Sequence, residues 1–242
     1  MFGGGAVTFE IEPPRGTIND INKRLMDFYK VVRDGPKELV QENARHKSDH
    51  DYYYKARQRF NEGNGKLSPV ERASLLLYLN RTCFNGLYRE NRRGEFNVPY
   101  GRYKNPDFIQ EQAIQEASVI LDRLEILNTD VRYIVKKAKK GDIVYLDPPY
   151  CPLSTTSSFT SYYKDDFGFS EQQRLKTIVT ELDEKGVFIV LSNSSSAQIR
   201  QLYEGISGFR ISDILARRAI NCNGQRRGEV GEIIVTNIPE RD

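Results

Sequence analysis

Two short apolar runs, residues 143–146 and 187–191, constrain the fold of this chain more than any other feature. Both contain only apolar and aromatic side chains, which is typical of parallel strands buried on both faces of a sheet. The segment between them carries Ser170 and Gln173 as a predicted helix cap and ends near Gly186. Strands that alternate with helices predict an α/β fold built on a parallel sheet.

The segments on either side of these runs extend the pattern. Residues 113–124 have helical spacing, and residues 210–215 and 232–236 are predicted to close the sheet as an antiparallel pair. Residues 35–110, by contrast, contain no strong strand pattern, and a Ser-Pro-Val-Glu sequence at 68–71 predicts a capped helix start. We therefore predict an insertion in this region.

The first twenty residues predict a glycine turn, a helix, a strand and an acidic end. Phe2 precedes three consecutive glycines at positions 3–5, and residues 17–20 read Thr-Ile-Asn-Asp. In a doubly wound sheet, the acidic residue after the second strand lies near the first glycine turn and accepts hydrogen bonds from ribose hydroxyls. Asp20 is the candidate for this role, and a plain flexible glycine loop is the alternative.

A stiff acidic loop follows the 143–146 run. Asp147 is followed by Pro148 and Pro149, whose rings fix their φ angles, and then by Tyr150. Sites of open α/β sheets lie at such carboxyl ends of strands. The loop suits a planar amine, because the carboxylate and the Pro148 carbonyl can accept its protons while the Tyr150 ring stacks on the heterocycle. The alternative is a turn in which the prolines end the strand and Asp147 caps a neighbour.

The basic residues that could contact nucleic acid are clustered locally. The net charge is only +3, so the chain as a whole does not establish an anionic partner. Between residues 81 and 104, however, six basic residues stand against two acidic ones and are interleaved with Phe and Tyr. Basic groups neutralise phosphates, and aromatic and arginine side chains reach bases. This segment is therefore a candidate DNA surface, with a solvated charged loop as the alternative.

The remaining composition narrows the class of protein. Three scattered cysteines, no secretion signal and no long apolar run argue against a disulfide scaffold and against a membrane-spanning chain. We expect a soluble, cytoplasmic protein with reduced thiols. His46 and His50 are spaced like metal ligands on a helix, but no third ligand accompanies them. A solvated polar segment and no bound metal are expected.

Several separated motifs resemble those of the Dam-type DNA adenine methyltransferases, the alpha-group or D12-class enzymes that use S-adenosylmethionine. The motifs are Phe-Gly-Gly-Gly-Ala at 2–6, the basic and aromatic stretch at 81–103, Asp-Pro-Pro-Tyr at 147–150, and shorter stretches at 158–162 and 217–224. The glycine motif comes first, the insertion follows, and Asp-Pro-Pro-Tyr comes after it. This order resembles the group in which the insertion is the DNA target-recognition domain. The similarity extends from Phe2 to about Ile234.

This resemblance implies a fold and a domain organisation. It implies a Rossmann-like methyltransferase sheet with helices on both faces, plus an inserted, mainly helical target-recognition domain with a hairpin. The discontinuous catalytic domain is expected at residues 1–35 and 111–242, and the target-recognition domain at residues 36–110.

The resemblance also assigns roles to single residues. Phe84 is expected to wedge into the base stack where the target adenine leaves, and Arg89 to read a guanine edge. Leu87 and Pro99 are expected to contact a thymine methyl group, and Tyr103 the outer base pair. The other expected DNA contacts are Asn85, Arg102, Arg217 and Arg218. The expected cofactor contacts are Phe2, Gly3, Gly4, Gly5, Asp20, Asp130, Val131 and Asp147. The expected catalytic residues are Asp147, Pro148, Pro149 and Tyr150.

The implied reaction is methyl transfer from S-adenosylmethionine to the N6 amino group of a flipped adenine in double-stranded DNA, with GATC as the expected site. No metal or membrane takes part, and a monomer is expected. One alternative is methylation of the exocyclic amine of cytosine, which the same loop suits. The other is an inactive DNA-binding remnant, because family members carry a first strand and a Lys-containing stretch where this sequence has only Met1.

Overall fold

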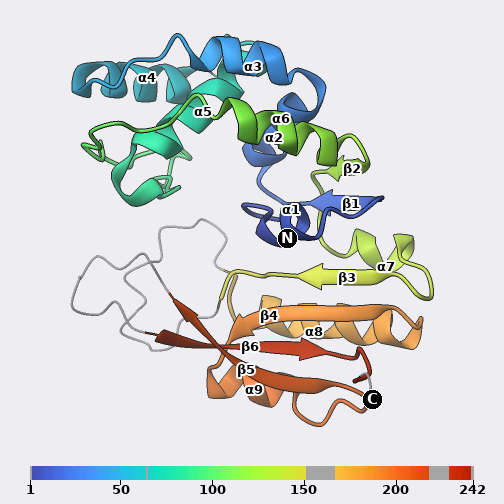
Figure 1. The fold of residues 1–242 in the computed structure, drawn as a ribbon. Coiled ribbons are helices and arrows are strands. Elements are labelled where there is room, and N and C mark those ends of the chain that lie inside the picture. The colour runs from blue at the N-terminus through green and yellow to red at the C-terminus, as the bar shows by residue number, and fades with distance from the viewer. Residues whose placement is uncertain (1, 64, 151–166, 218–228, 241–242) are drawn as a thin grey trace. The chain divides into compact units, whose positions relative to one another are not determined.

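The computed structural model describes residues 2–63, 65–150, 167–217 and 229–240 of the chain (Figure 1). It divides into two units, Phe2–Thr129 and Asp130–Asp242. The stretches at 158–162 and 218–224 that carry part of the family resemblance lie outside the described residues. Within the described part of the chain, no helix is long and apolar enough to cross a membrane.

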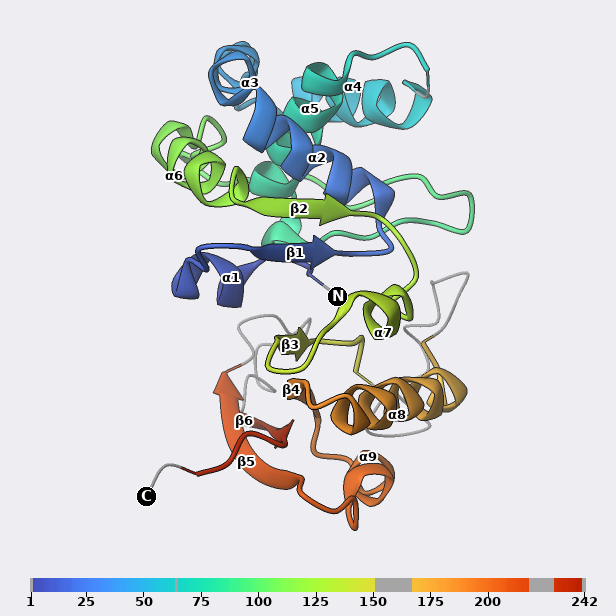
Figure 2. The same ribbon diagram turned by 90° about the vertical axis from the view of Figure 1, so that its right-hand side faces the viewer.

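The first unit contains a two-stranded parallel sheet and most of the helices. Its elements are α1 (Ala6–Ile11), β1 (Gly16–Asn19), α2 (Lys23–Asp34), α3 (Pro36–Asn43), α4 (His50–Glu62), α5 (Pro69–Thr82), the 3-10 helix η1 (Phe84–Gly86), α6 (Glu111–Leu121) and β2 (Leu124–Leu127). Figure 2 shows β1 beside β2, with α2 and α6 next to β2. A glycine turn, helix, strand and acidic residue therefore follow one another as predicted.

Two apolar cores hold this unit together. Ile18 and Ile126 of the strands pack with Met26 of α2 and Leu121 of α6. A second core joins α4 and α5 to the segment after them, through the buried set Tyr53, Phe60, Leu75, Tyr78, Leu79, Cys83, Phe96 and Val98. The predicted helix start at Ser68 is confirmed as a reciprocal capping box with Glu71.

The second unit is built on a four-stranded mixed sheet. Its elements are α7 (Tyr133–Lys137), β3 (Ile143–Leu146), α8 (Phe169–Glu184), β4 (Phe188–Ser194), α9 (Ala197–Tyr203), β5 (Arg210–Arg217) and β6 (Glu229–Thr236). The strand order is β3-β4-β6-β5. β3 and β4 are parallel, and β5 and β6 pair antiparallel, as predicted.

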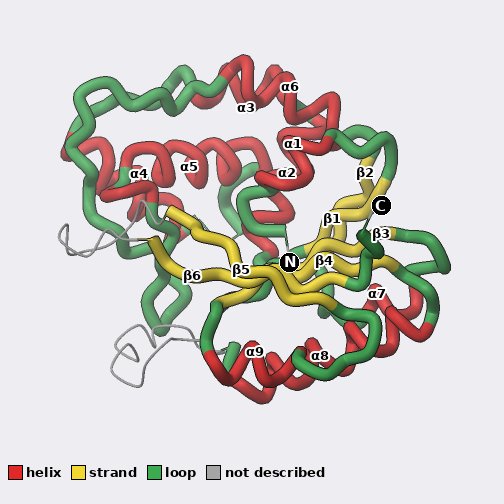
Figure 3. The backbone as a smooth tube through the Cα atoms, turned by 60° about the horizontal axis from the view of Figure 1, so that its bottom comes forward, coloured by secondary structure: helices red, strands yellow, loops and turns green. Residues whose placement is uncertain are grey.

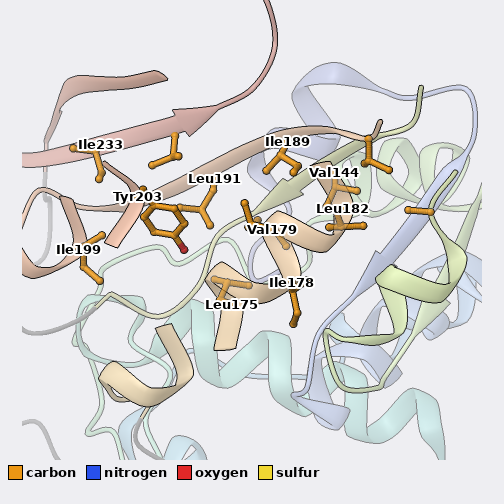
Figure 4. Close-up of a cluster of buried hydrophobic side chains, with 14 residues drawn as sticks. Val144, Leu175, Ile178, Val179, Leu182, Ile189, Leu191, Ile199, Tyr203 and Ile233 are labelled. Carbon is orange, nitrogen blue, oxygen red and sulfur yellow. The ribbon is translucent and has the colours of Figure 1, made fainter. Parts of the chain in front are cut away.

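The described helices of this unit lie on one face of its sheet (Figure 3). Alternate strand residues, such as Val144, Ile189 and Ile233, face Ile178 of α8 and Ile199 of α9 in one apolar core (Figure 4). Ile143, Tyr145 and Phe188 on the other face of these strands are exposed. Burial therefore alternates along the strand, unlike the burial on both faces that the apolar runs predicted. The chain thus has a mixed α/β fold, and one continuous sheet with helices on both faces remains a prediction.

Three local predictions were wrong at element ends. Ser170 lies inside α8, whose N-cap is Gly168 without a side-chain cap. Leu124 begins β2 instead of ending α6, because its backbone pairs with Gly16. β4 continues to Ser194 instead of ending at Leu191, because β6 supplies pairing partners along the whole segment.

Candidate functional site

The acidic loop after β3 is the centre of the candidate site in the second unit. β3 ends at Leu146, which pairs with Leu191, and the chain then turns through Asp147, Pro148 and Pro149. Asp147 is exposed, whereas Pro148 is buried. The carboxyl group predicted to act on substrate is therefore accessible and is not turned into the core.

Ser192 of β4 holds the carboxylate of Asp147. Its Oγ donates to Asp147 Oδ1 at 2.7 Å, and the hydroxyl of Tyr145 donates to Ser192 Oγ at 3.4 Å. Ser192 is only 5% exposed. Ser192 thus engages one of the two carboxylate oxygens, Oδ1.

A buried amide pair holds the other end of the loop. Gln172 of α8 donates from Nε2 to the carbonyl of Pro149 at 3.1 Å, and Asn193 of β4 donates from Nδ2 to Gln172 Oε1 at 2.9 Å. Both side chains are fully buried. Buried amides with satisfied partners rigidify the backbone that they bind.

Tyr150 leads out of the loop and is half-buried. Its hydroxyl donates to Glu232 Oε2 of β6 at 3.2 Å. Burial raises the pKa of the Tyr150 hydroxyl to about 12, and the nearby carboxylates of Asp147 and Glu232 act in the same direction. The side chain therefore remains a neutral phenol at physiological pH.

In the first unit the structure brings the glycine turn and Asp20 together. Asp20 Oδ2 accepts hydrogen bonds from the backbone N–H groups of Phe2 and Gly3, each at 3.0 Å, and Oδ1 accepts from Asn22 N at 2.9 Å. Gly3 and Gly5 have φ angles of 55° and 72°, in the left-handed region that favours glycine. Asp20 thus closes the turn, a role that the sequence did not predict.

Space remains around this turn for a ligand. Among the described residues other than the chain neighbours, a Cβ atom at Gly3 or Gly4 would meet no atom within 4 Å, whereas one at Gly5 would lie 2.6 Å from the rings of Phe2 and Phe9. A carboxylate offers about four acceptor positions, and the three backbone N–H groups use three of them. The remaining position on Asp20 is compatible with a ribose hydroxyl.

Asp130 and Val131, the predicted contacts of the cofactor adenine, lie at the start of the second unit. Arg174 of α8 donates to Asp130 Oδ1 at 2.5 Å, and the backbone N–H of Arg132 donates to the same atom at 2.9 Å. The hydrogen bond from Arg174 lowers the pKa of the Asp130 carboxyl below its usual range. Val131 packs against the apolar core of the unit.

Residues 83–103 form an antiparallel hairpin, called the 83–103 hairpin below. Cys83 bridges to Tyr100, Glu90 bridges to Phe96, and Phe84 N donates to the Pro99 carbonyl at 2.8 Å. The hairpin contains the DNA contacts predicted between residues 84 and 103. Its exposed members are Phe84, Arg89, Pro99, Arg102 and Tyr103, and its half-buried members are Asn85 and Leu87.

The guanidinium of Arg89 is oriented within this hairpin. Its Nε donates to Asn97 Oδ1 at 2.8 Å, and one Nη2 hydrogen donates to the Asn97 carbonyl at 3.3 Å. These two bonds use Nε and one hydrogen of Nη2, and the Arg89 side chain is exposed. A guanidinium also carries one outward N–H on each Nη atom. The fork of these two N–H groups is the geometry that pairs with O6 and N7 of guanine.

Two predicted DNA contacts lie at the edge of what the structure describes. The backbone of Arg217 pairs with Glu229 at the end of β5, and Arg218 lies outside the described residues.

The two histidines do not share a helix face. His46 precedes α4, is 8% exposed, and bonds to Tyr52 Oη at 2.8 Å and Ser74 Oγ at 2.9 Å. The expectation of a solvated segment is therefore wrong for His46, because these partners lie on other elements that enclose it. His50 begins α4 and is exposed. Among the described residues, no group of His, Cys, Asp and Glu has the arrangement of a metal site.

Sequence reasoning missed the residues that hold the acidic loop. Gln172, Ser192 and Asn193 are polar and buried. Gln172 of α8 and Ser192 of β4 bond to the loop, and Asn193 of β4 bonds to Gln172. The available signal was the polar run Ser192 to Ser194 directly after an apolar strand. Polar residues at the carboxyl end of a strand next to a candidate site are typical of such supporting contacts.

Known proteins resemble this chain along almost its whole length. The sequence model of the D12 class N6 adenine-specific DNA methyltransferases matches residues 2–220. A Lactococcus lactis protein named Type II methyltransferase M1.LlaDCHI is 43% identical over 98% of this chain and 84% of its own length. Type II methyltransferase M.MjaIII of Methanocaldococcus jannaschii is 40% identical over 97% and 86%. A Serratia marcescens protein named DNA adenine methylase is 35% identical over 96% and 85%.

Proposed function

Since the chain belongs to the D12 class of N6 adenine-specific DNA methyltransferases, we propose that it transfers a methyl group from S-adenosylmethionine to the N6 amino group of a flipped adenine in GATC. The observation that carries this proposal is the exposed carboxylate of Asp147, held on a proline-stiffened loop at the end of a parallel strand. The target must leave the duplex, because its amino group is otherwise paired and stacked.

The acidic loop is proposed to bind the adenine amino group. Asp147 Oδ2 accepts one amino hydrogen and the Pro148 carbonyl accepts the other, while the Tyr150 ring stacks on the base. These bonds favour a more tetrahedral nitrogen, whose lone pair is then less delocalised into the ring. Holding the amino group in one orientation also removes much of the entropic barrier.

The glycine turn is proposed to hold the cofactor together with Asp20, Asp130 and Val131. Bound S-adenosylmethionine supplies an electrophilic methyl group. The open space beside Gly3 and Gly4 and the remaining acceptor position on Asp20 support this assignment. Phe2 would line the methionine part of the cofactor.

Residues 36–110 are proposed to form the target-recognition domain, inserted between two parts of a Rossmann-like catalytic domain. The 83–103 hairpin carries the sequence that resembles Dam-type recognition segments. Arg89 would read guanine, Leu87 and Pro99 would contact thymine, and Phe84 would occupy the space that the adenine leaves. The exposed side chains of Phe84, Arg89 and Pro99 support this assignment.

Transfer of a labelled methyl group tests the function directly. The chain is incubated with labelled S-adenosylmethionine and a duplex containing GATC, beside a matched duplex in which GATC is changed to GTTC. We expect label on the first duplex only, N6-methyladenine after digestion, and a roughly hundredfold or larger loss in Asp147→Asn. Label on both duplexes would refute the GATC assignment, N4-methylcytosine would refute the adenine assignment, and DNA binding without transfer would indicate an inactive binding protein.

A further inference from the structure

β4 extends past β3 beside the candidate catalytic loop. β3 ends at Leu146, opposite Leu191, whereas β4 continues to Ser194. Ser192 and Asn193 are consecutive residues of this extension, so their side chains point to opposite faces of the sheet. Ser192 bonds directly to Asp147 of the loop, whereas Asn193 bonds to Gln172, which in turn bonds to Pro149 of the loop.

The donor and acceptor of each hydrogen bond at Ser192 are fixed by the chemistry of its partners. The Asp147 carboxylate can only accept, so the Ser192 hydroxyl donates its one proton to Oδ1. Ser192 Oγ can then accept from Tyr145, whose hydroxyl keeps its proton because burial raises its pKa. This chain of donors fixes Asp147 Oδ1 toward β4.

The donor and acceptor roles of the Asn193 and Gln172 amides are also fixed. Asn193 Oδ1 accepts from the backbone N–H of Ser194 at 2.8 Å, which leaves Nδ2 to donate to Gln172 Oε1. Gln172 must therefore present Nε2 to the Pro149 carbonyl. Both amides are fully buried, so loss of either partner leaves polar atoms without water.

We propose that Ser192 and the Asn193–Gln172 pair are positioning residues that hold the acidic loop at two points for methyl transfer. The two held groups, Asp147 Oδ1 and the Pro149 carbonyl, flank the Asp147 Oδ2 and Pro148 carbonyl assigned to the adenine amino group. Proline rings fix φ but leave ψ free. Hydrogen bonds at Asp147 and at Pro149 are therefore both needed to orient Asp147 Oδ2 and the Pro148 carbonyl. The assignment rests on the proposed function, because it gives Asp147 and Pro148 their substrate.

Ser192→Ala tests the first anchor, with Ser194→Ala as the matched control. Both serines lie on the same face of β4, but the Ser194 hydroxyl contacts Ser196 and not the loop. We expect Ser192→Ala to lower the single-turnover methylation rate roughly tenfold or more at saturating DNA and cofactor, with the cofactor dissociation constant within twofold of wild type. Ser194→Ala should stay within twofold, and Ser192→Thr, which keeps the hydroxyl, should recover most of the rate.

Gln172→Met tests the second anchor while keeping the side-chain volume. It should lower the same rate roughly tenfold without a matching change in the Michaelis constant for DNA. Since a buried amide is lost, circular dichroism confirms that the variant is folded at the assay temperature. If it is not folded, Asn193→Ser takes its place, which removes the Nδ2 donor to Gln172 together with the Oδ1 acceptor of the Ser194 N–H.

The outcomes separate this assignment from the proposed function. A wild-type chain that transfers no methyl group overturns both. A wild-type chain that methylates adenine while Ser192→Ala and the folded second-anchor variant keep their rates overturns the positioning role alone. An equal loss in Ser192→Ala and Ser194→Ala also overturns it, because the loss would then reflect general damage to β4.

Discussion

Arg24 donates to Glu90 at 2.7 Å, and this ion pair joins α2 to the 83–103 hairpin. Tyr88 donates to the same carboxylate oxygen, and the Arg24 guanidinium lies 5.2 Å from the centre of the Phe60 ring. The side chains of the pair are only 22% and 29% exposed. Arg24 lies four residues after Asp20 in the first turn of α2, so one short segment supports both the glycine turn and the hairpin.

We predict that Arg24→Met weakens binding to GATC duplexes more than binding to unrelated DNA. Loss of Arg24 leaves the partly buried Glu90 carboxylate without its ion-pair partner and with only the Tyr88 hydroxyl of the two donors, at a cost of roughly 1 to 3 kcal/mol. The hairpin that presents Arg89 should then become less ordered. Fluorescence anisotropy with the two duplexes measures the ratio of affinities.

Lys23→Met is the matched control for that variant. Lys23 also loses an ion pair, with Asp27, but its side chain is 74% exposed, so little change is expected. Equal effects of the two substitutions would contradict a specific role for Arg24. Glu90→Gln combined with Arg24→Met should be less costly than the sum of the single changes.

We predict that Asp20→Ala lowers cofactor affinity at least tenfold. The change removes the acceptor that closes the glycine turn on Phe2 and Gly3, and hydrogen bonds to a charged group contribute roughly 1.5 to 3 kcal/mol. Isothermal titration with S-adenosylmethionine gives the affinity, and hydrogen exchange at residues 2–5 reports the opening of the turn. Unchanged exchange together with lost affinity would indicate a direct contact and no role in the turn.

We predict that folding stability falls as the pH drops from about 6.5 to about 4. Burial lowers the pKa of His46 from 6.5 to about 4, so the folded chain keeps His46 neutral while the unfolded chain takes up a proton. The stabilisation is therefore complete above pH 6.5 and is lost at lower pH, by about 3 kcal/mol for this shift. Urea unfolding at several pH values measures it.

The hydrogen bonds around His46 explain why its imidazole stays neutral in the folded protein, because neither ring nitrogen can take up a second proton without losing a partner. Asn43 Nδ2 donates to the Ile109 carbonyl, so Asn43 Oδ1 accepts from the Ser74 hydroxyl. Ser74 Oγ then accepts from His46 Nε2–H, and His46 Nδ1 accepts from Tyr52. In His46→Gln the added pH dependence should disappear, whereas His50→Gln should retain it. A wild-type curve parallel to that of His46→Gln would contradict this account.

We predict that Tyr203→Phe leaves stability unchanged or raises it by up to about 1 kcal/mol. Within the described part of the chain, the buried Tyr203 hydroxyl has no hydrogen-bond partner, and its ring packs among Leu191 and Ile199 (Figure 4). Removing an unsatisfied hydroxyl relieves a desolvation cost while the ring is kept. Thermal unfolding measures the change, and a loss above 1 kcal/mol would be inconsistent with an unpaired hydroxyl.

The local sequence predicted those elements whose stability depends on near neighbours. The apolar run before Asp147 forms β3, and Ser68 forms its capping box with Glu71 three residues away. The order of glycine turn, helix, strand and Asp20 was also readable, because each step is short. Motif order in the chain indicated the methyltransferase family, which the relatives confirm.

Only the tertiary structure showed what holds the candidate site in place. Ser192 and Gln172 contact the acidic loop from 45 and 23 residues away along the chain, and Glu90 meets Arg24 across 66. The polar run from Ser192 to Ser194 indicates supporting contacts near the end of a strand, but the local sequence does not specify which groups these side chains contact. Pairing with β6 carries β4 past the apolar run that marked it, and packing of separate helices buries His46. Local pattern therefore determined the elements and the chemical groups of the site, whereas long-range packing decided which polar side chains were removed from water and which groups they orient.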